Sequence, residues 1–252
     1  MGALSRSQRK SIESLVQQFE THCDEFRLLT EQVRLRISET KPLFSLIHSL
    51  KWRVKEPAHL REKLERKIEA AGMEGRAFEI TEDNLFLKIN DLAGIRLLHL
   101  HTRQMDKIHR HLSEAFEEGQ YPIVEGPIAK TWDNETRDYF KKIGIQTEDS
   151  NSLYTSVHYV IQSNSRTKYT CEIQVRTLAE ELWGEVSHSF NYPNPTRSIA
   201  CGEQIKVLAR VTSSCSRLVD SVYLSRREYE EKIVAPLSKK RQWQRDKRGT
   251  GH

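Results

Sequence analysis

Two short segments joined by a turn decide the fold: LYTSVHYVIQ (residues 153–162) and KYTCEIQVRT (residues 168–177). The intervening SNSRT (163–167) is typical of a hairpin turn. Successive side chains of a strand point to opposite faces, so each segment separates a polar set from an apolar set. The polar face gathers side chains of very different chemistry: Tyr154, Ser156, His158, Glu172, Gln174 and Arg176. An ordinary half-exposed hairpin is the alternative, but a solvated face usually repeats Lys, Glu and Thr.

Outside the hairpin, hydrophobic spacing predicts further helices and strands. Apolar residues three, four and seven apart predict one long helix over residues 5–38. More helices are expected over residues 59–71, 104–118 and 178–190 and after Pro195, and strands over residues 43–54, 95–101 and 121–128. Residues 129–151 read as irregular, with one helical turn near Asp138.

Strands and helices therefore mix without strict alternation. This pattern favours an α/β fold of the α+β kind, with a mixed, mainly antiparallel β-sheet flanked by helices. We expect three segments along the chain: an N-terminal helix (1–40), a core (41–195), and C-terminal helices with a basic tail (196–252).

The 252 residues carry a net charge of +5. Much of the excess lies in the tail, where one acid, Asp246, faces six basic residues: Lys239, Lys240, Arg241, Arg245, Lys247 and Arg248. A short basic tail is more often a solvated end than a binding site. No apolar run approaches the roughly 20 residues that span a bilayer, and the first residues lack the apolar stretch of a secretory signal. We therefore expect no membrane partner.

The cysteines suggest the compartment. Cys23, Cys171, Cys201 and Cys215 are scattered, without a CxxC pair or a nearby His/Cys cluster. Such spacing suits a reducing compartment better than a disulfide framework or a zinc site, so we expect a cytoplasmic protein.

Four segments resemble the synthetase domain of the RelA/SpoT family, above all its small single-domain alarmone synthetases. The four motifs that match are Arg53-x-Lys55 with Lys63, Asp91-x-x-Gly94-x-Arg96, Tyr154-x-Ser156-x-His158, and Glu172-Ile-Gln174-Val-Arg176-Thr177. Trp183 and His188 match the W…H pattern of the following helix. The resemblance spans roughly residues 40 to 193, and its last motif is highly specific.

The resemblance implies a nucleotidyltransferase-like synthetase domain and a pyrophosphokinase activity. In this reaction the β,γ-diphosphate of ATP is transferred to the 3′-hydroxyl of GDP or GTP, which makes the alarmone (p)ppGpp. ATP and GDP or GTP are then the substrates. No HD dipeptide or partner His/Asp cluster of the family's hydrolase half is present, so a degrading activity is not expected.

A metal site at two carboxylates is expected on chemical grounds. Diphosphate transfer requires charge stabilisation on phosphate oxygens, and Mg²⁺ usually takes one or two carboxylates together with substrate phosphates. Asp91 precedes a predicted buried strand and Glu172 lies within another, so both could converge on one sheet face. By resemblance Asp91 binds the metal, and Glu172 binds it too or helps deprotonate the attacking hydroxyl.

The resemblance also implies the two nucleotide sites. Arg53, Lys55, Lys63 and Arg96 form the ATP site. Arg53, Lys55 and Lys63 would grip the ATP phosphates, or, as the resemblance implies, Arg53 and Arg96 would instead clamp the adenine between their guanidinium planes. Tyr154 stacks the acceptor base, with His158 and Gln174 close to the acceptor. Plainer roles for single residues stay open: Lys63 as an exposed helix cation, Arg96 as a structural partner of Glu172, and Asp91 as a turn cap.

The acceptor stretch departs from the family pattern K-x-N-G-Y-R-S, because Ser150, Leu153 and Thr155 replace its lysine, glycine and arginine. The phosphate loop also lacks the usual serines, since residues 56–59 read EPAH. The basic group that would hold the acceptor's 5′-phosphates is then weakened or supplied elsewhere. Candidates in the sequence are Arg137, Lys141 and Lys142.

Two other functions stay open. A toxic relative would apply the same chemistry to adenine nucleotides or to the 3′ end of tRNA, which suits the altered acceptor loop. A catalytically inactive module would bind nucleotides or RNA, although the pair Asp91 and Glu172 argues against it. The sequence also leaves a homo-oligomer, and a tRNA or antitoxin partner, open.

Overall fold

The computed structural model describes residues 4–150, 152–191 and 195–234 of the chain. The predicted basic tail lies outside these residues. No helix among the described residues is both long enough and apolar enough to cross a membrane.

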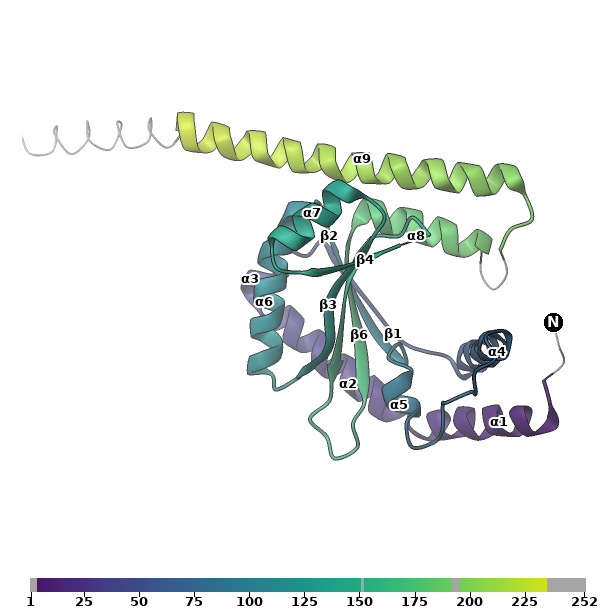
Figure 1. The fold of residues 1–252 in the computed structure, drawn as a ribbon. Helices are drawn as coiled ribbons and strands as arrows, with labels where there is room; N and C mark the ends of the chain where they lie inside the picture. Colours follow the sequence, from purple (N-terminus) through teal and green to yellow (C-terminus); the bar gives the residue numbers. More distant parts are fainter. Residues whose placement is uncertain (1–3, 151, 192–194, 235–252) are drawn as a thin grey trace, which may run out of the picture.

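A mixed six-stranded sheet with helices around it forms the centre of the described fold (Figure 1). Its strands are β1 (Ser49–Val54), β2 (Ala93–His99), β3 (Ile123–Thr131), β4 (Gln146–Asp149), β5 (Ser156–Gln162) and β6 (Thr170–Thr177), in the order β1-β2-β6-β5-β3-β4. The β1–β2, β6–β5 and β5–β3 pairs are antiparallel, whereas β2–β6 and β3–β4 are parallel. The predicted mixed, mainly antiparallel sheet is confirmed.

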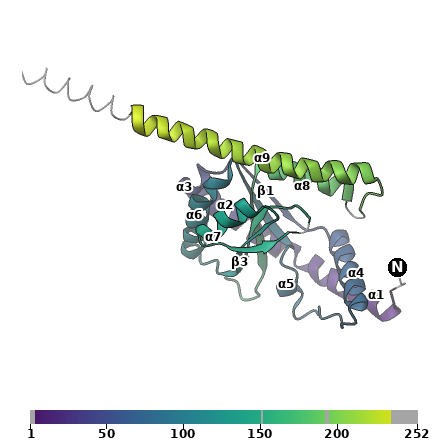
Figure 2. The same cartoon turned by 45° about the horizontal axis from the view of Figure 1, so that its top comes forward.

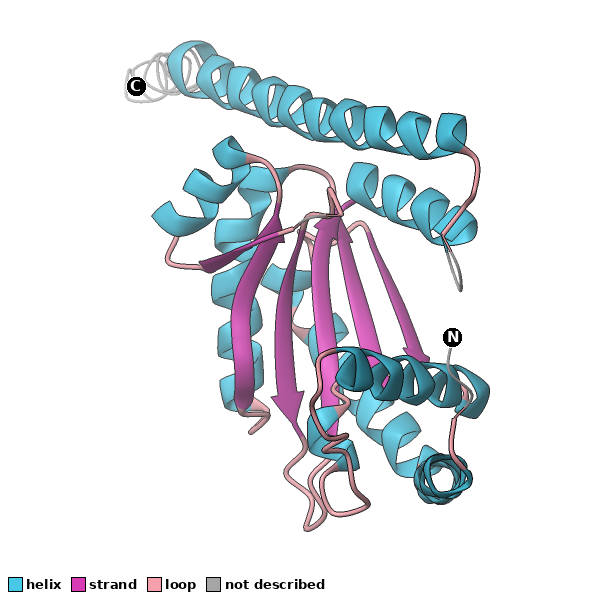
Figure 3. Ribbon diagram, turned by 45° about the vertical axis from the view of Figure 1, so that its right-hand side comes forward, coloured by secondary structure: helices cyan, strands magenta, loops and turns pink. Residues whose placement is uncertain are grey.

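The helices surround this sheet on three sides. They are α1 (Arg6–Thr21), α2 (Cys23–Glu39), α3 (Lys41–Phe44), α4 (Pro57–Met73), α5 (Leu85–Lys88), α6 (Met105–Glu118), α7 (Asn134–Lys142), α8 (Leu178–Asn191) and α9 (Ile199–Tyr229), with 3₁₀ turn η1 (Thr102–Gln104) and π-turn η2 (Glu230–Val234). Figures 2 and 3 show α8 and α9 lying together across one end of the sheet.

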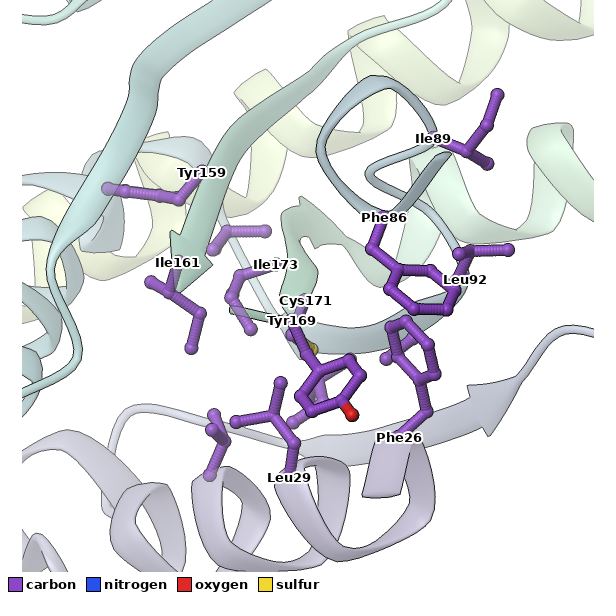
Figure 4. Packing of buried hydrophobic residues seen from close by; sticks show 14 of the residues in the cluster. Phe26, Leu29, Phe86, Ile89, Leu92, Tyr159, Ile161, Tyr169, Cys171 and Ile173 are labelled. Atoms are coloured by element: carbon purple, nitrogen blue, oxygen red, sulfur yellow. The ribbon is translucent and has the colours of Figure 1, made fainter. Parts of the chain in front are cut away.

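The apolar face of the sheet packs into one continuous core. Side chains of α1, α2, α4 and α6 share this core with the inward residues of β2, β5 and β6. Figure 4 shows its aromatic part, where the rings of Phe26, Phe86 and Tyr169 lie 5.0–5.5 Å apart. This packing fixes the orientation of the sheet, so the opposite face is left for polar side chains.

The predicted single helix over residues 5–38 is two helices. The break is at His22, whose φ and ψ of −113° and 10° are not helical. His22 Nδ1 and Thr21 Oγ1 both bind the carbonyl oxygen of Gln18, which satisfies an acceptor at the end of α1. Apolar spacing alone did not reveal this break, because both helices face the same core.

The segment predicted to be irregular, 129–151, has regular structure in its described residues, 129–150. These residues form the end of β3, then α7 and the edge strand β4. Asp133 caps α7 by accepting a hydrogen bond from the backbone nitrogen of Glu135. The predicted strand over residues 43–54 also needs correction, because its first residues belong to α3 and β1 begins only at Ser49.

Candidate active site

The strand register brings the predicted site residues onto one face of the sheet. Residues that pair across neighbouring strands share a face. One such row consists of Lys51, Arg96, Gln174, His158 and Ile128, and the next of Arg53, Gly94, Glu172 and Val160. Five strands therefore contribute side chains to this one face, as the alternation in the hairpin predicts for β5 and β6.

Asp91 lies at the start of this surface, immediately before β2, and is held by two lysines. Lys63 Nζ on α4 lies 2.7 Å from Asp91 Oδ1, and Lys55 Nζ lies 3.0 Å from Oδ2. Burial acts to raise the pKa of Asp91, but the two ammonium groups outweigh it and hold this pKa below its ordinary value. Lys63 is therefore not an isolated helix cation, and Asp91 is ionised at neutral pH.

Glu172, in the middle of β6, is also held as a carboxylate. His158 Nδ1 donates to its Oε1 at 2.9 Å, and Gln174 Nε2 donates to its Oε2 at 2.9 Å. Burial acts to raise the pKa of Glu172, as does the nearby charge of Asp91, but these hydrogen bonds hold the pKa below its ordinary value. His158 Nε2 is buried and has no hydrogen-bond partner among the described residues.

Two cavities meet at this pair of carboxylates. The first, of about 270 Å³, lies over β1 and β2 and is lined by Arg53, Gly94 and Arg96 among others. The second, of about 350 Å³, is called the lysine cavity here because Lys63, Lys67, Lys88 and Lys130 line it. Asp91 and Glu172 line both cavities. A molecule in one cavity could therefore meet a molecule in the other at these two side chains.

The first cavity contains an ion-pair network that the sequence did not predict. Arg96 Nη1 lies 2.8 Å from Glu181 Oε1 and 2.7 Å from Glu185 Oε1, both on α8. The buried Glu181 also pairs with Arg176 and, at 2.7 Å, with Lys51. Despite burial, its cationic neighbours lower the pKa of Glu181 to about 2. Arg96 thus pairs with these acids, not with Glu172, which corrects the plainer role considered above.

Arg53 differs from Arg96 in that it lies toward the open side of β1. It pairs with Gly94 in the register and also lines the first cavity. The two arginines therefore border the same space. An adenine ring between them stays a prediction.

Tyr154 precedes β5 and lies beside His158. Their ring centroids are 5.7 Å apart, and the guanidinium of Arg176 lies 5.6 Å from the Tyr154 ring. Tyr154 also packs toward Trp183 on α8, at 6.3 Å between centroids. Burial raises the pKa of Tyr154, so its hydroxyl stays protonated. Tyr154 has the neighbours of a packed aromatic as well as a place beside His158, so stacking of a base stays a prediction.

The residues that sequence reasoning missed are mostly partners from distant segments. Glu181 and Glu185 are separated from Arg96 by 85 and 89 positions, and no local motif connects them. Gly184 is the residue of α8 that lets this helix approach Arg176 closely, because a Cβ there would lie 2.7 Å from Arg176 Nη1. Lys130 was missed because it lies in a segment that reads as irregular.

Comparisons with known proteins agree with this geometry. The sequence model described as "Region found in RelA / SpoT proteins" matches residues 52–197. The GTP pyrophosphokinase YjbM of Bacillus subtilis (strain 168) is 26% identical over 236 residues, which cover 89% of this chain and 96% of that protein.

Solved structures show the same fold. The small alarmone synthetase 1 from Bacillus subtilis bound to its product pppGpp has a TM-score of 0.57 and 21% identity, covering 84% of this chain and 98% of that one. The same synthetase bound to AMPCPP has a TM-score of 0.54 and 17% identity, covering 81% and 95%. Because the family match spans more than half of the residues, this chain belongs to the RelA/SpoT family.

Proposed function

We propose that this chain is a pyrophosphokinase that transfers the β,γ-diphosphate of ATP to the 3′-hydroxyl of GDP or GTP, making (p)ppGpp. The observation that carries the proposal is that Asp91 and Glu172 line both cavities. A transferase for two nucleotides needs a charged centre that both can reach. The similarity to a protein named GTP pyrophosphokinase, at nearly full length, supports the same activity.

In this proposal the first cavity holds the donor. Arg53 and Arg96 present guanidinium planes to the adenine, since such planes stack well on aromatic rings. Lys55 and Lys63 hold Asp91, where the two cavities meet, so both would reach the phosphates that are transferred. Lys63 also lines the lysine cavity and therefore lies between the two substrates. The two lysines exchange part of their contact with the Asp91 carboxylate for contact with the phosphates, which keeps their charge compensated.

The lysine cavity, bordered by His158 and by β3, holds the acceptor. Its 3′-oxygen attacks the β-phosphorus of ATP and the hydroxyl proton is released to solvent. The bond from that phosphorus to the α–β bridging oxygen breaks, and AMP leaves with that oxygen. Glu172 is a weak base because its pKa is depressed. A carboxylate has about four lone-pair positions, so Glu172 can accept a hydrogen bond from the 3′-hydroxyl and orient it toward the phosphorus.

The same two carboxylates fit a magnesium ion. Among the described residues no group of three or more His, Cys, Asp or Glu side chains is placed to hold a metal. Mg²⁺ nevertheless takes only one or two protein carboxylates when substrate phosphates complete its shell. Asp91 and Glu172 would hold it, and when bound it would neutralise charge on the transferred diphosphate.

The remaining expectations are parts of the same proposal. A cytoplasmic location fits the nucleotide substrates and the four free cysteines. The adenine-nucleotide, tRNA and inactive-module alternatives are less well supported, since the named relative is a GTP pyrophosphokinase and the two solved structures compared above are of a small alarmone synthetase. A homo-oligomer and a tRNA or antitoxin partner stay predictions.

Product identification tests the proposal. The protein would be incubated with ATP labelled in the β-phosphate and with GDP, GTP, ADP, ATP or tRNA in turn, and the products separated by chromatography. Label in ppGpp or pppGpp is expected. Label in an adenine nucleotide or in tRNA would assign the toxic alternative, and no transfer to any acceptor would favour the inactive module.

A further inference from the structure

Lys130 on β3 is a cation of the lysine cavity without a partner. Among the described residues it makes no hydrogen bond and no ion pair, although Glu148 lies beside it in the β3–β4 register. Its side chain instead lines the cavity that also contains His158 and Glu172. A half-buried, uncompensated ammonium group facing a cavity is a candidate anion-binding group.

The other lysines of this cavity lie on helices. Lys63 is bound to Asp91, and Lys67 lies one turn further along α4. Lys88 Nζ, at the end of α5, lies 3.9 Å from Glu79. Lys130 is the lysine that the sheet contributes to this cavity, from the strand next to the one that carries His158.

The strand register fixes this position. Ile128 pairs with His158, and Lys130 pairs with Ser156, so Lys130 shares the polar face with both. β3 lies two strands from β6, about 10 Å at the usual strand spacing. Lys130 pairs with Ser156 whereas Glu172 pairs with Val160, so the two positions are also offset by four residues, about 13 Å, along the strands. Because both side chains line the same cavity, a nucleotide whose 3′-hydroxyl is at Glu172 can extend its 5′-phosphates toward Lys130.

His158 also lines this cavity. Its Nδ1 carries the proton donated to Glu172, and its buried Nε2 has no partner among the described residues. The cavity thus combines the free ammonium of Lys130 with the imidazole that holds Glu172 as a carboxylate.

We infer that Lys130 binds the 5′-phosphates of the acceptor and so selects a nucleoside 5′-diphosphate or triphosphate. The inference rests on the proposed function and names the residue that replaces the missing lysine at Ser150. The sequence candidates fit less well, because Arg137 is bound to Asn134, Asp149 and the carbonyl oxygen of Thr131. Lys141 and Lys142 do not line the cavity.

The test compares Lys130→Met with two matched variants. Lys142→Met removes a cation from α7, and Lys107→Met removes an exposed one from α6, which packs on the other face of the sheet. Lys130→Met should raise the KM for GDP about tenfold to a hundredfold, the usual range for one charge-assisted contact. The KM for ATP should not change, the penalty should vanish when guanosine is the acceptor, and Lys130→Arg should restore most of the affinity.

Other outcomes overturn the inference. A raised KM for ATP alone would assign Lys130 to the donor, and an effect of Lys142→Met without one of Lys130→Met would assign α7. If the wild type transfers diphosphate to no acceptor, the proposed function fails and calorimetry with GDP decides. Weaker GDP binding by Lys130→Met, with equal guanosine binding, would still support the inference. Equal GDP binding, or none by the wild type, would overturn it.

Discussion

The proposed donor and acceptor sides of the polar face are built in different ways. On the proposed donor side most cations already have partners: Lys55 and Lys63 hold Asp91, and Arg96 is fixed by Glu181 and Glu185. Arg53 is the exception, because it makes no ion pair with any described residue. On the proposed acceptor side, Lys130 and His158 Nε2 have no partner within the described part of the chain. In this assignment the donor side is largely preorganised by the chain itself, whereas Lys130 would gain its partner from the ligand.

The backbone of the proposed acceptor side also has an unusual feature. Leu153, immediately before Tyr154, has a φ of 60°. This left-handed conformation costs a residue with a Cβ roughly 1–2 kcal/mol, and the family pattern has a glycine at this place. On this side of the molecule α7 follows β3 in the sequence, and β4 extends the sheet beyond β3. The acceptor loop therefore departs from the family pattern in its backbone as well as in its sequence, whereas on the donor side the departure is in the sequence of residues 56–59.

The largest effect is expected where the two sides meet. Glu172→Gln or Asp91→Asn should lower turnover by about a hundredfold or more, because a charge that stabilises the transferred diphosphate is removed. Circular dichroism should show an unchanged fold. Glu117→Gln, an exposed change on α6, serves as the matched control. Full activity in Glu172→Gln would remove the basis for a shared centre.

The next effect should belong to the donor side alone. Arg53→Ala and Lys63→Ala should each raise the KM for ATP about tenfold or more, since each loses one contact of a charged group. The KM for GDP should stay within about twofold on the same scale. Steady-state kinetics with each substrate varied in turn would measure both values. A rise confined to the GDP value would mean that the two cavities have been assigned to the wrong substrates.

A smaller effect is expected on the acceptor side at Tyr154. Stacking of a base on an aromatic ring is worth about 1–3 kcal/mol, so Tyr154→Ala should reduce acceptor use about tenfold, while Tyr154→Phe should be nearly silent. The packing of Tyr154 toward Trp183 and Arg176 offers a rival explanation. Melting temperatures of both variants separate the two. A destabilised Tyr154→Ala protein with unchanged acceptor KM would make Tyr154 a packing residue only.

The last predicted effect is on the stability of the sheet that carries both proposed sites, and not on activity. His99, at the end of β2, is buried with Nδ1 3.0 Å from the carbonyl oxygen of His101, and burial lowers its pKa to about 4. Between about pH 6.5 and 4 the unfolded chain therefore binds this proton and the folded chain does not. The free energy of unfolding should fall as the pH falls through this window, by at most about 1.4 kcal/mol per pH unit from this group.

His99→Asn keeps a polar side chain at this position and removes the titration. Denaturant unfolding of both proteins at several pH values would measure the difference. The variant should show a shallower loss of stability over the window. Equal slopes in the two proteins would mean that other groups, such as Asp91 and Glu172, account for the acid sensitivity.

Much of the site was predictable because it depends on local alternation. Glu172 and Gln174 are two residues apart in one strand, so their side chains point to the same face of the sheet. The register places His158 opposite Gln174, on that same face. The position of Asp91 just before a strand could also be predicted, since the buried strand that follows it, β2, is strongly apolar. What these residues bind stays a prediction.

The rest depends on contacts that no local pattern encodes. Glu181 has an ordinary position in the first turn of a helix, and only the fold brings Lys51, Arg96 and Arg176 to it. β4 has four residues, too few for an alternation to be recognised. Lys130 follows Pro127 in a segment with little hydrophobic period, so its place on the polar face could be known only from its pairing with β5.

The central claim is that an intact diphosphate moves from ATP to a guanosine nucleotide at the carboxylates shared by the two sides. Phosphorus NMR of a reaction containing ATP, GDP and magnesium tests it most directly. If the diphosphate is transferred intact, AMP should appear in step with a new diphosphate on the guanosine 3′-oxygen. Glu172→Gln should abolish both signals. Formation of ADP and inorganic phosphate, or of AMP without a 3′-diphosphate, would contradict it.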